Sequence, residues 1–325
     1  MDEEDTLKQN TNQRKIIIGM VSVLIGEVLF GFSYLFTKDI TTDISPLALL
    51  SWRFVFAFAV MSLCVKIGWF QINLKEKGFK KLLPLMLVSP VLYFLAEAYG
   101  IARTTASESG MILAAIPIAA LVASAVVLKE RPTRPQAIGI GITVSGVVMV
   151  VLVKGLQTSF DVMGYIILLA AIVSYSLFSV YIQKNTEHTA VEKTYVMIGA
   201  GAIVFSLMAL IESGMQNGLK EFVMLPFINV KFLIAIIYLG ILCSVCGFVL
   251  YNLAISYIGT NRSASFVGIS TLTAVLAGVV ILKEQILSGQ VVGMLLILCG
   301  VYIANRGYGY RPKDKKEKNR NHGVG

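Results

Sequence analysis

Long apolar segments joined by short polar connections run through almost the whole chain. Each is about 20 residues long, the length at which an α-helix crosses the hydrocarbon core of a bilayer. Backbone groups in lipid must pair within their own segment, and these segments are too long for barrel strands, so helices are expected. The pattern therefore predicts an all-α integral membrane protein with ten transmembrane helices. They cover about 16–37, 46–66, 80–102, 107–128, 135–153, 162–183, 191–213, 230–256, 262–282 and 288–306.

One sequence pattern occurs twice, at a constant separation of 154 residues. Leu128-Lys129-Glu130 precedes Gln136, Gly139 and Gly146, and Leu282-Lys283-Glu284 precedes Gln290, Gly293 and Gly300. Each half of the chain holds five spans, and because five is odd, the second half enters the membrane from the opposite side. This predicts two inverted five-helix repeats over 15–154 and 155–306, with tails at 1–14 and 307–325. Inverted repeats typically form a substrate site between them near the bilayer midplane and expose it to each side in turn.

The composition agrees with a membrane location. The 325 residues are 56% hydrophobic and 14% charged, with a mean hydropathy of +0.76, whereas soluble domains carry about 25% charged residues. The longest connections, near 67–79 and 214–229, are too short to hold an inserted soluble domain. All four cysteines lie in apolar runs, so we expect packing residues rather than disulfides or metal ligands. They are Cys64, Cys243, Cys246 and Cys299.

Basic residues are concentrated in alternate connections, which predicts the orientation of the chain. With the N-terminus inside, the opposite side holds only Lys38, Arg103, Lys154, Lys220, Lys231 and Lys283. The positive-inside rule then predicts a multi-pass protein of the cell (inner) membrane with both termini in the cytoplasm. This orientation also accounts for the net charge of +9 without a nucleic-acid partner. Residues 1–14, acidic and then basic, are expected to form a disordered cytoplasmic tail.

Three charged residues lie away from the ends of the predicted spans, where an ionised side chain is costly and usually faces the bundle interior or a water-filled path. They are Glu27, Arg53 and Glu97. In a functional interpretation, Glu27 or Glu97 binds a proton or a cationic group, and Arg53 binds a carboxylate. In a structural interpretation, a buried Glu–Arg pair fixes the packing of the helices. Glu108 and Glu212 lie near span ends and are expected to be solvated.

The Leu-Lys-Glu turn at the end of the fourth span of each repeat is accompanied by further motif residues. They are Gly31, Phe32, Lys38, Arg53, Phe54, Ala98, Tyr99, Ala106 to Gly110, and Pro117. Together, over about residues 15–306, these features resemble the EamA family of the drug/metabolite transporter superfamily. The resemblance implies a transporter of small metabolites, often amino acids or related solutes, and frequently an exporter.

The resemblance also bears on single positions. Because Arg53 belongs to the family pattern, its structural role is favoured. Small multidrug members of the superfamily use a first-span Glu for proton and drug exchange, and this analogy favours Glu27 as a functional carboxyl. The Trp often found before the first-span Gly is Phe30 here, which is expected to alter the pocket. The second-repeat counterpart of Pro117 is Thr271, which predicts a ninth span straighter than the fourth.

Two groups of residues complete the prediction. The predicted pathway for substrate or coupling ion comprises Glu27, Tyr34, Arg53, Tyr93, Glu97, Tyr175, Ser179, Tyr251 and Asn252. The predicted packing and repeat-motif group comprises Pro117, Glu130, Gly139, Gly146, Glu284, Gly293 and Gly300. The glycines are expected to allow close helix contacts. Glu130 and Glu284 are expected to have a structural or gating role at the membrane surface.

Other classes of function find less support in the sequence. Both histidines, His188 and His322, lie outside the predicted spans, and the sequence has no metal-ligand cluster, nucleophile–base motif or Walker motif. We therefore expect no enzyme, no metal and no cofactor. The expected partners are a small-molecule substrate and the lipid bilayer. A lipid or lipid-linked-sugar translocase and a metabolite uptake permease remain alternatives, and proton coupling and a homodimer remain open.

Overall fold

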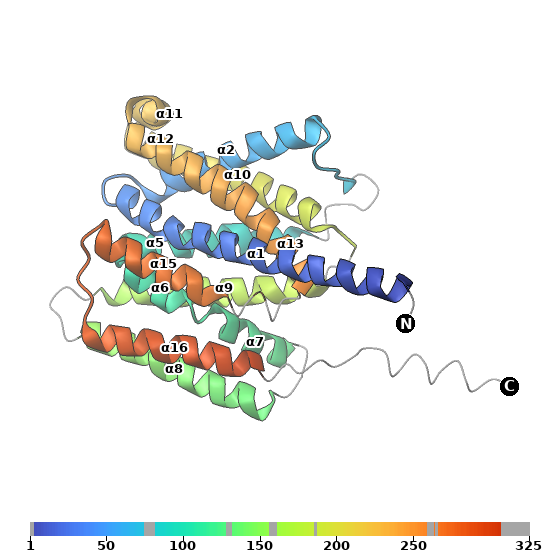
Figure 1. Cartoon of the computed structure of the whole chain (residues 1–325). Coiled ribbons are helices and arrows are strands. Elements are labelled where there is room, and N and C mark those ends of the chain that lie inside the picture. The colour runs from blue at the N-terminus through green and yellow to red at the C-terminus, as the bar shows by residue number, and fades with distance from the viewer. Residues whose placement is uncertain are drawn as a thin grey trace.

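The computed structural model describes residues 3–74, 82–127, 132–155, 161–184, 187–258, 263 and 266–306. Figure 1 shows a bundle of long helices in which the start of the first helix and the end of the last lie toward the same end. In the described part of the chain, nine helical spans are long and apolar enough to cross a membrane. The remaining predicted span contains a shorter apolar helix of 14 residues. The all-helical prediction is confirmed.

The predicted spans correspond to the following helices. They are α1 (Glu3–Thr41), α2 (Pro46–Lys66), α4 with η2 and α5 (Leu83–Met86, Leu87–Leu92 and Tyr93–Arg103), α6 with α7 (Ala106–Leu113 and Ile116–Val127), α8 (Arg134–Gly155), α9 (Val162–Lys184), α10 (Ala190–Met215), α12 with η3 and α13 (Val230–Ile237, Tyr238–Gly247 and Phe248–Ile258), α15 (Val267–Val280) and α16 (Ser288–Arg306).

Helix α1 begins at Glu3, so the prediction of a disordered tail over residues 1–14 is wrong for its described part. The helix of the first span continues into the polar sequence because extending a formed helix costs far less than starting one.

The connection near 214–229 contains a further short helix, α11 (Leu219–Ile228), which the span pattern did not predict. It crosses the end of the bundle beside α12 (Figure 1). The side chain of Trp52 in α2 anchors it, since its indole nitrogen donates a hydrogen bond of 3.1 Å to the Phe222 carbonyl oxygen. The large apolar side chains of Phe227 and Ile228 remain exposed.

The third and eighth spans, which are counterparts in the two repeats, each contain a π-helical segment. In the third span it is η2, where Ser89 has extended dihedral angles (φ −143°, ψ 121°). Pro90 follows, and a proline disfavours the α conformation of the residue before it. In the eighth span the segment is η3. Both helices are therefore irregular at comparable depths in the bundle.

The fourth and ninth spans differ as the sequence predicts. The fourth is divided into α6 and α7 by a turn at Ala114 and Ala115, just before Pro117. The ninth passes through the corresponding position around Thr271 as one continuous helix, α15. Because proline removes a backbone donor and clashes with the preceding turn, its presence in only one repeat explains the difference.

The two repeats contact each other through α8 and α16. A Cβ atom added to Gly146 would lie 2.6 Å from the Gly293 carbonyl oxygen, and one added to Gly300 would lie 2.7 Å from the Gly139 carbonyl oxygen. No real side chain tolerates such distances, so the four glycines allow the two backbones to touch. This geometry is what the predicted packing role of these glycines requires.

The contact between α8 and α16 joins positions that correspond to each other in the two repeats. Thr143 donates a hydrogen bond of 3.5 Å to the carbonyl oxygen of Ile297, its own counterpart 154 positions later. The first turns of α8 and α16 also form the same hydrogen bond. The side-chain oxygen of Gln136 accepts from the Thr133 backbone nitrogen at 2.8 Å, and that of Gln290 accepts from the Leu287 backbone nitrogen at 3.0 Å. Likewise α1 packs on α13 and α15, whereas its counterpart α9 packs on α5 and α7. The fold is thus two inverted repeats.

Candidate functional site

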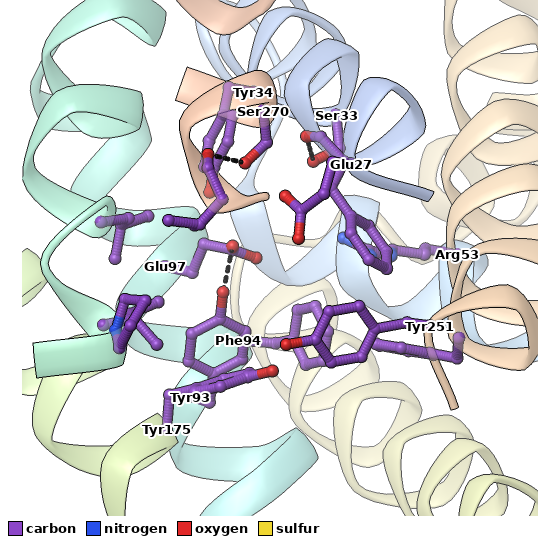
Figure 2. A pocket seen from close by; sticks show the side chains of 16 residues that line it. Glu27, Ser33, Tyr34, Arg53, Tyr93, Phe94, Glu97, Tyr175, Tyr251 and Ser270 are labelled. Atoms are coloured by element: carbon purple, nitrogen blue, oxygen red, sulfur yellow. Dashed lines mark hydrogen bonds between the residues drawn. The ribbon is translucent and has the colours of Figure 1, made fainter. Parts of the chain in front are cut away.

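A cavity lies between the two repeats, at the level of the irregular spans. It is lined from the first repeat by α1, α2, α5 and the α6–α7 region, and from the second by α9, α13 and α15. Its empty volume is about 720 Å³, its opening included. Figure 2 shows that carboxylates, one guanidinium and several phenolic hydroxyls point into this space.

Glu97 reaches the cavity from α5 and is 8% exposed. Tyr93 precedes it by four residues and therefore lies on the same face of the helix. The Tyr93 hydroxyl donates a hydrogen bond of 2.6 Å to Glu97 Oε1 (Figure 2). A short bond to a carboxylate indicates a charge-assisted interaction. It orients the carboxylate and leaves its second oxygen available toward the cavity.

Arg53 comes from α2 and is only 4% exposed. Its Nε donates a hydrogen bond of 3.1 Å to Ser244 Oγ in η3. The Ser244 hydroxyl itself donates to the Leu239 carbonyl oxygen at 2.8 Å, so its lone pairs are free to face Arg53. The guanidinium carbon lies 4.6 Å from the centre of the Phe94 ring, a cation–π distance.

Glu27 projects from α1 and is 4% exposed. Ser270 of α15 also lines the cavity, and its hydroxyl donates to the Val267 carbonyl oxygen at 2.8 Å. Among the described residues, neither Glu27 nor Glu97 forms an ion pair with Arg53 at 4.0 Å or less. The three charged groups therefore surround one cavity without the direct Glu–Arg pair of the structural interpretation.

Aromatic rings form much of the remaining wall. The rings of Tyr93 and Tyr175 meet edge to face at 5.2 Å between centroids. Those of Phe30 and Tyr251 do so at 6.2 Å. The side chains of Tyr175 from α9 and Tyr251 from α13 lie side by side in the cavity wall (Figure 2).

Seven of the nine predicted pathway residues line this cavity: Glu27, Tyr34, Arg53, Tyr93, Glu97, Tyr175 and Tyr251. The other two do not. Ser179 donates to the Tyr175 carbonyl oxygen at 3.0 Å within its own helix. Asn252 donates from its side-chain nitrogen to Thr194 Oγ1 in α10 at 3.2 Å. The roles of the lining residues remain predictions.

Some lining residues were missed or placed in another group. Pro117, predicted only as a packing residue, lines the cavity. Ser33, Phe94 and Phe248 line it without having been singled out. A phenylalanine in an apolar span cannot be told apart from the other apolar residues by sequence. For Phe94, the only indication was its position next to Tyr93, a predicted pathway residue.

The acidic residues at the ends of the spans behave differently from the prediction. Glu108, expected to be solvated, is buried, pairs with Lys154 Nζ at 3.1 Å and accepts from Gln290 Nε2 at 3.1 Å. Glu212 is half-buried and accepts a hydrogen bond from Ser45. Both were mispredicted because their partners come from distant helix ends. Glu130 lies outside the described residues.

The comparison with known proteins agrees with the fold. The EamA-like transporter family matches residues 17–152 and 162–306. A solved crystal structure of a protein shares the fold with a TM-score of 0.57 and 17% identity, over 90% of this chain and 98% of that one.

Several curated transporters are similar in sequence. The uncharacterized transporter YcxC of Bacillus subtilis is 32% identical over 287 residues, which are 88% of this chain and 92% of that protein. A probable amino-acid metabolite efflux pump of Salmonella typhimurium is 22% identical over 219 residues, 67% of this chain and 72% of that protein. The family match spans both repeats, and the chain accordingly belongs to the EamA-like transporter family and is a multi-pass membrane transporter.

Proposed function

We propose that this transporter exports amino acids or closely related small metabolites by alternating access, and that the cavity is its substrate site. The observation that carries the proposal is the placement of Arg53, Glu27 and Glu97 around one cavity between the repeats. An amino acid carries one carboxylate and one ammonium group. The guanidinium is the complementary partner of the first, and a carboxylate is the complementary partner of the second.

Arg53 is prepared to bind a carboxylate. Ser244 holds its Nε and the Phe94 ring supports its plane, so the side chain has few conformations left to lose on binding. A planar guanidinium binds a carboxylate through two parallel hydrogen bonds, which a lysine cannot do. The low exposure of the site strengthens these interactions relative to water.

Glu97 is the better placed partner for the ammonium group. Its orientation is fixed by Tyr93, and aromatic rings, which attract cations to their faces, surround it. The acidic and aromatic groups together would select an ammonium group, whereas Arg53 opposite them would select the acid.

The Salmonella relative, a probable amino-acid metabolite efflux pump, supports both the substrate class and the outward direction. A lipid-linked or phosphorylated substrate fits the cavity less well. Its described lining contains one arginine, no lysine and two glutamates, and carboxylates repel a phosphate.

We assign proton coupling to Glu27. A carboxyl that is buried, lines the cavity and forms no ion pair among the described residues can take up and release a proton while Glu97 holds the ammonium group of the substrate. Movement of the proton inward would then drive the substrate outward. This direction corresponds to export, in the orientation with cytoplasmic termini that the positive-inside rule predicts.

The test compares the metabolites released by cells that overproduce the native chain, the Arg53→Lys variant or neither. One or more amino acids enriched in the medium only with the native chain would support the proposal. Equal release of all amino acids, with native protein present in the membrane, would overturn export as the function. Uptake assays in vesicles would then test the opposite direction.

A further inference from the structure

Glu284 joins the two repeats at the end of the bundle opposite the chain termini. It lies in the connection from α15 to α16, a segment that runs along the left side of the bundle in Figure 1. Glu284 Oε1 accepts a hydrogen bond of 2.7 Å from the Ala106 backbone nitrogen, and Oε2 accepts one of 2.9 Å from that of Ser107. The Ser107 hydroxyl adds a third bond of 2.5 Å to Oε2. A residue of the second repeat thus caps helix α6 of the first.

The local backbone is built for this contact. Lys283 has a φ of +57°, a conformation that non-glycine residues rarely adopt, and it turns the chain back toward α6. The Glu284 backbone nitrogen donates to the Gly278 carbonyl oxygen at 3.0 Å, which fixes the turn against the end of α15. Gly278 also leaves the space in which Glu284 meets Ser107, since a Cβ atom there would collide with both side chains.

A close-packed seam leads from the cavity to this contact. Ser270, Ala274 and Gly278 are spaced by four residues and share one face of α15. A Cβ atom added to Gly31 would lie 2.7 Å from the Ser270 carbonyl oxygen, and one added to Gly110 would lie 2.6 Å from Ala274 Cβ. Helices α1, α6 and α15 therefore touch along this seam.

The seam begins at the cavity, and the Glu284 contact lies beyond the cavity on each element. On α15 the lining ends at Ser270, and Gly278 follows two turns later. On α1 the lining ends at Tyr34, and Lys38 follows one turn later. Lys38 Nζ donates to the Ala102 carbonyl oxygen of α5 at 2.9 Å, so the first and third spans are also joined at this level.

We propose that the contact of Glu284 with Ala106 and Ser107 is the outer gate of this transporter: it holds α15 against α6 and closes the cavity toward the side opposite the termini. The gate opens when the Glu284 carboxylate leaves the start of α6 and the seam separates. This inference rests on alternating access in the proposed function, but not on the identity of the substrate.

The test measures access to the cavity from outside. Ser33, which lines the cavity, is replaced by Cys, and intact cells are treated with a membrane-impermeant thiol reagent. The parent chain with its four native cysteines gives the background. Adding Glu284→Gln removes the charge of a charge-assisted contact, and we expect labelling of the introduced cysteine to become about tenfold faster. Glu221→Gln, on the exposed helix α11 at the same end, is the matched control and should leave the rate unchanged.

Unchanged labelling in a folded Glu284→Gln protein would overturn the gate and leave Glu284 as a static helix cap. Should that variant not be recovered from membranes, Glu284→Asp replaces it: the charge is kept, but the shorter side chain cannot reach both backbone nitrogens. Faster labelling is again expected, and an unchanged rate again overturns the gate. Because labelling needs no transported solute, a failure of amino-acid export would leave this result standing, and the reverse also holds.

Discussion

Tyr93 donates its hydroxyl hydrogen to Glu97 Oε1 at 2.6 Å, one helical turn away, and both side chains face the cavity between the repeats. Tyr93→Phe keeps the ring and removes only this bond. We expect the KM for an exported amino acid to rise about fivefold, because one hydrogen bond that orients the carboxylate is lost. Transport assays in vesicles measure this change.

The matched control for Tyr93→Phe is Tyr257→Phe, since Tyr257 is 37% exposed on α13 and does not line the cavity. Its KM should equal that of the native protein. An unchanged KM in Tyr93→Phe would show that Glu97 needs no orientation by Tyr93.

Arg53→Lys is the sharpest test of carboxylate recognition. Lysine keeps the charge but loses the bond to Ser244, the planar contact with Phe94 and the two-point binding of a carboxylate. We expect affinity for an amino acid to fall about 10- to 100-fold. Affinity for the corresponding amino-acid amide, which lacks the carboxylate, should fall much less.

Ser244→Ala provides a graded version of that experiment, because it removes one hydrogen bond and leaves the guanidinium in place. A loss of about fivefold is expected for the amino acid. Equal losses for amino acid and amide in both variants would mean that Arg53 serves packing, as the structural interpretation holds.

Glu27→Gln tests proton coupling. The amide retains the shape of the side chain, but it cannot release a proton. We expect transport driven by a pH gradient to be lost, whereas exchange of labelled for unlabelled substrate across vesicles continues. Transport by this variant that still follows the pH gradient would remove Glu27 from the coupling mechanism.

The contact between α8 and α16 predicts a difference between two glycines of the same helix. A Cβ atom at Gly146 would collide with the α16 backbone, whereas one at Gly141 would meet nothing within 4 Å. Gly146→Ala should destabilise the protein by about 1–3 kcal/mol through overpacking. Gly141→Ala should be neutral or slightly stabilising, since alanine is the better helix former. Thermal unfolding in detergent compares them, and equal midpoints would contradict the proposed closeness.

Much of the fold could be predicted from the sequence, because the backbone of a segment that crosses lipid can adopt few structures. The second span begins and ends at the predicted residues, Pro46 and Lys66. The replacement of Pro117 by Thr271 correctly predicted which repeat keeps a continuous helix. These features depend on local sequence and on length, which a single chain displays directly.

The features that were missed depend on contacts between distant segments. The sequence alone suggested that Glu108 is solvated, but in the folded chain it pairs with Lys154. It also suggested that Asn252 faces the pathway, but its side chain donates a hydrogen bond to Thr194. The helical start at Glu3 follows from the helix behind it rather than from the residues themselves. Charged residues away from span ends were the most reliable guide to the lining of the cavity, because a charged side chain in a membrane span usually faces the bundle interior.

Helices α8 and α16, which touch through four glycines, contribute no side chain to the cavity among the described residues. Packing of the two repeats against each other and lining of the cavity are therefore carried out by different helices. Substitutions on the lipid-facing sides of this pair would change how many transporters a membrane accumulates and how long each survives. They would leave the ranking of solutes that each transporter accepts as it was, so that abundance and selectivity can evolve independently.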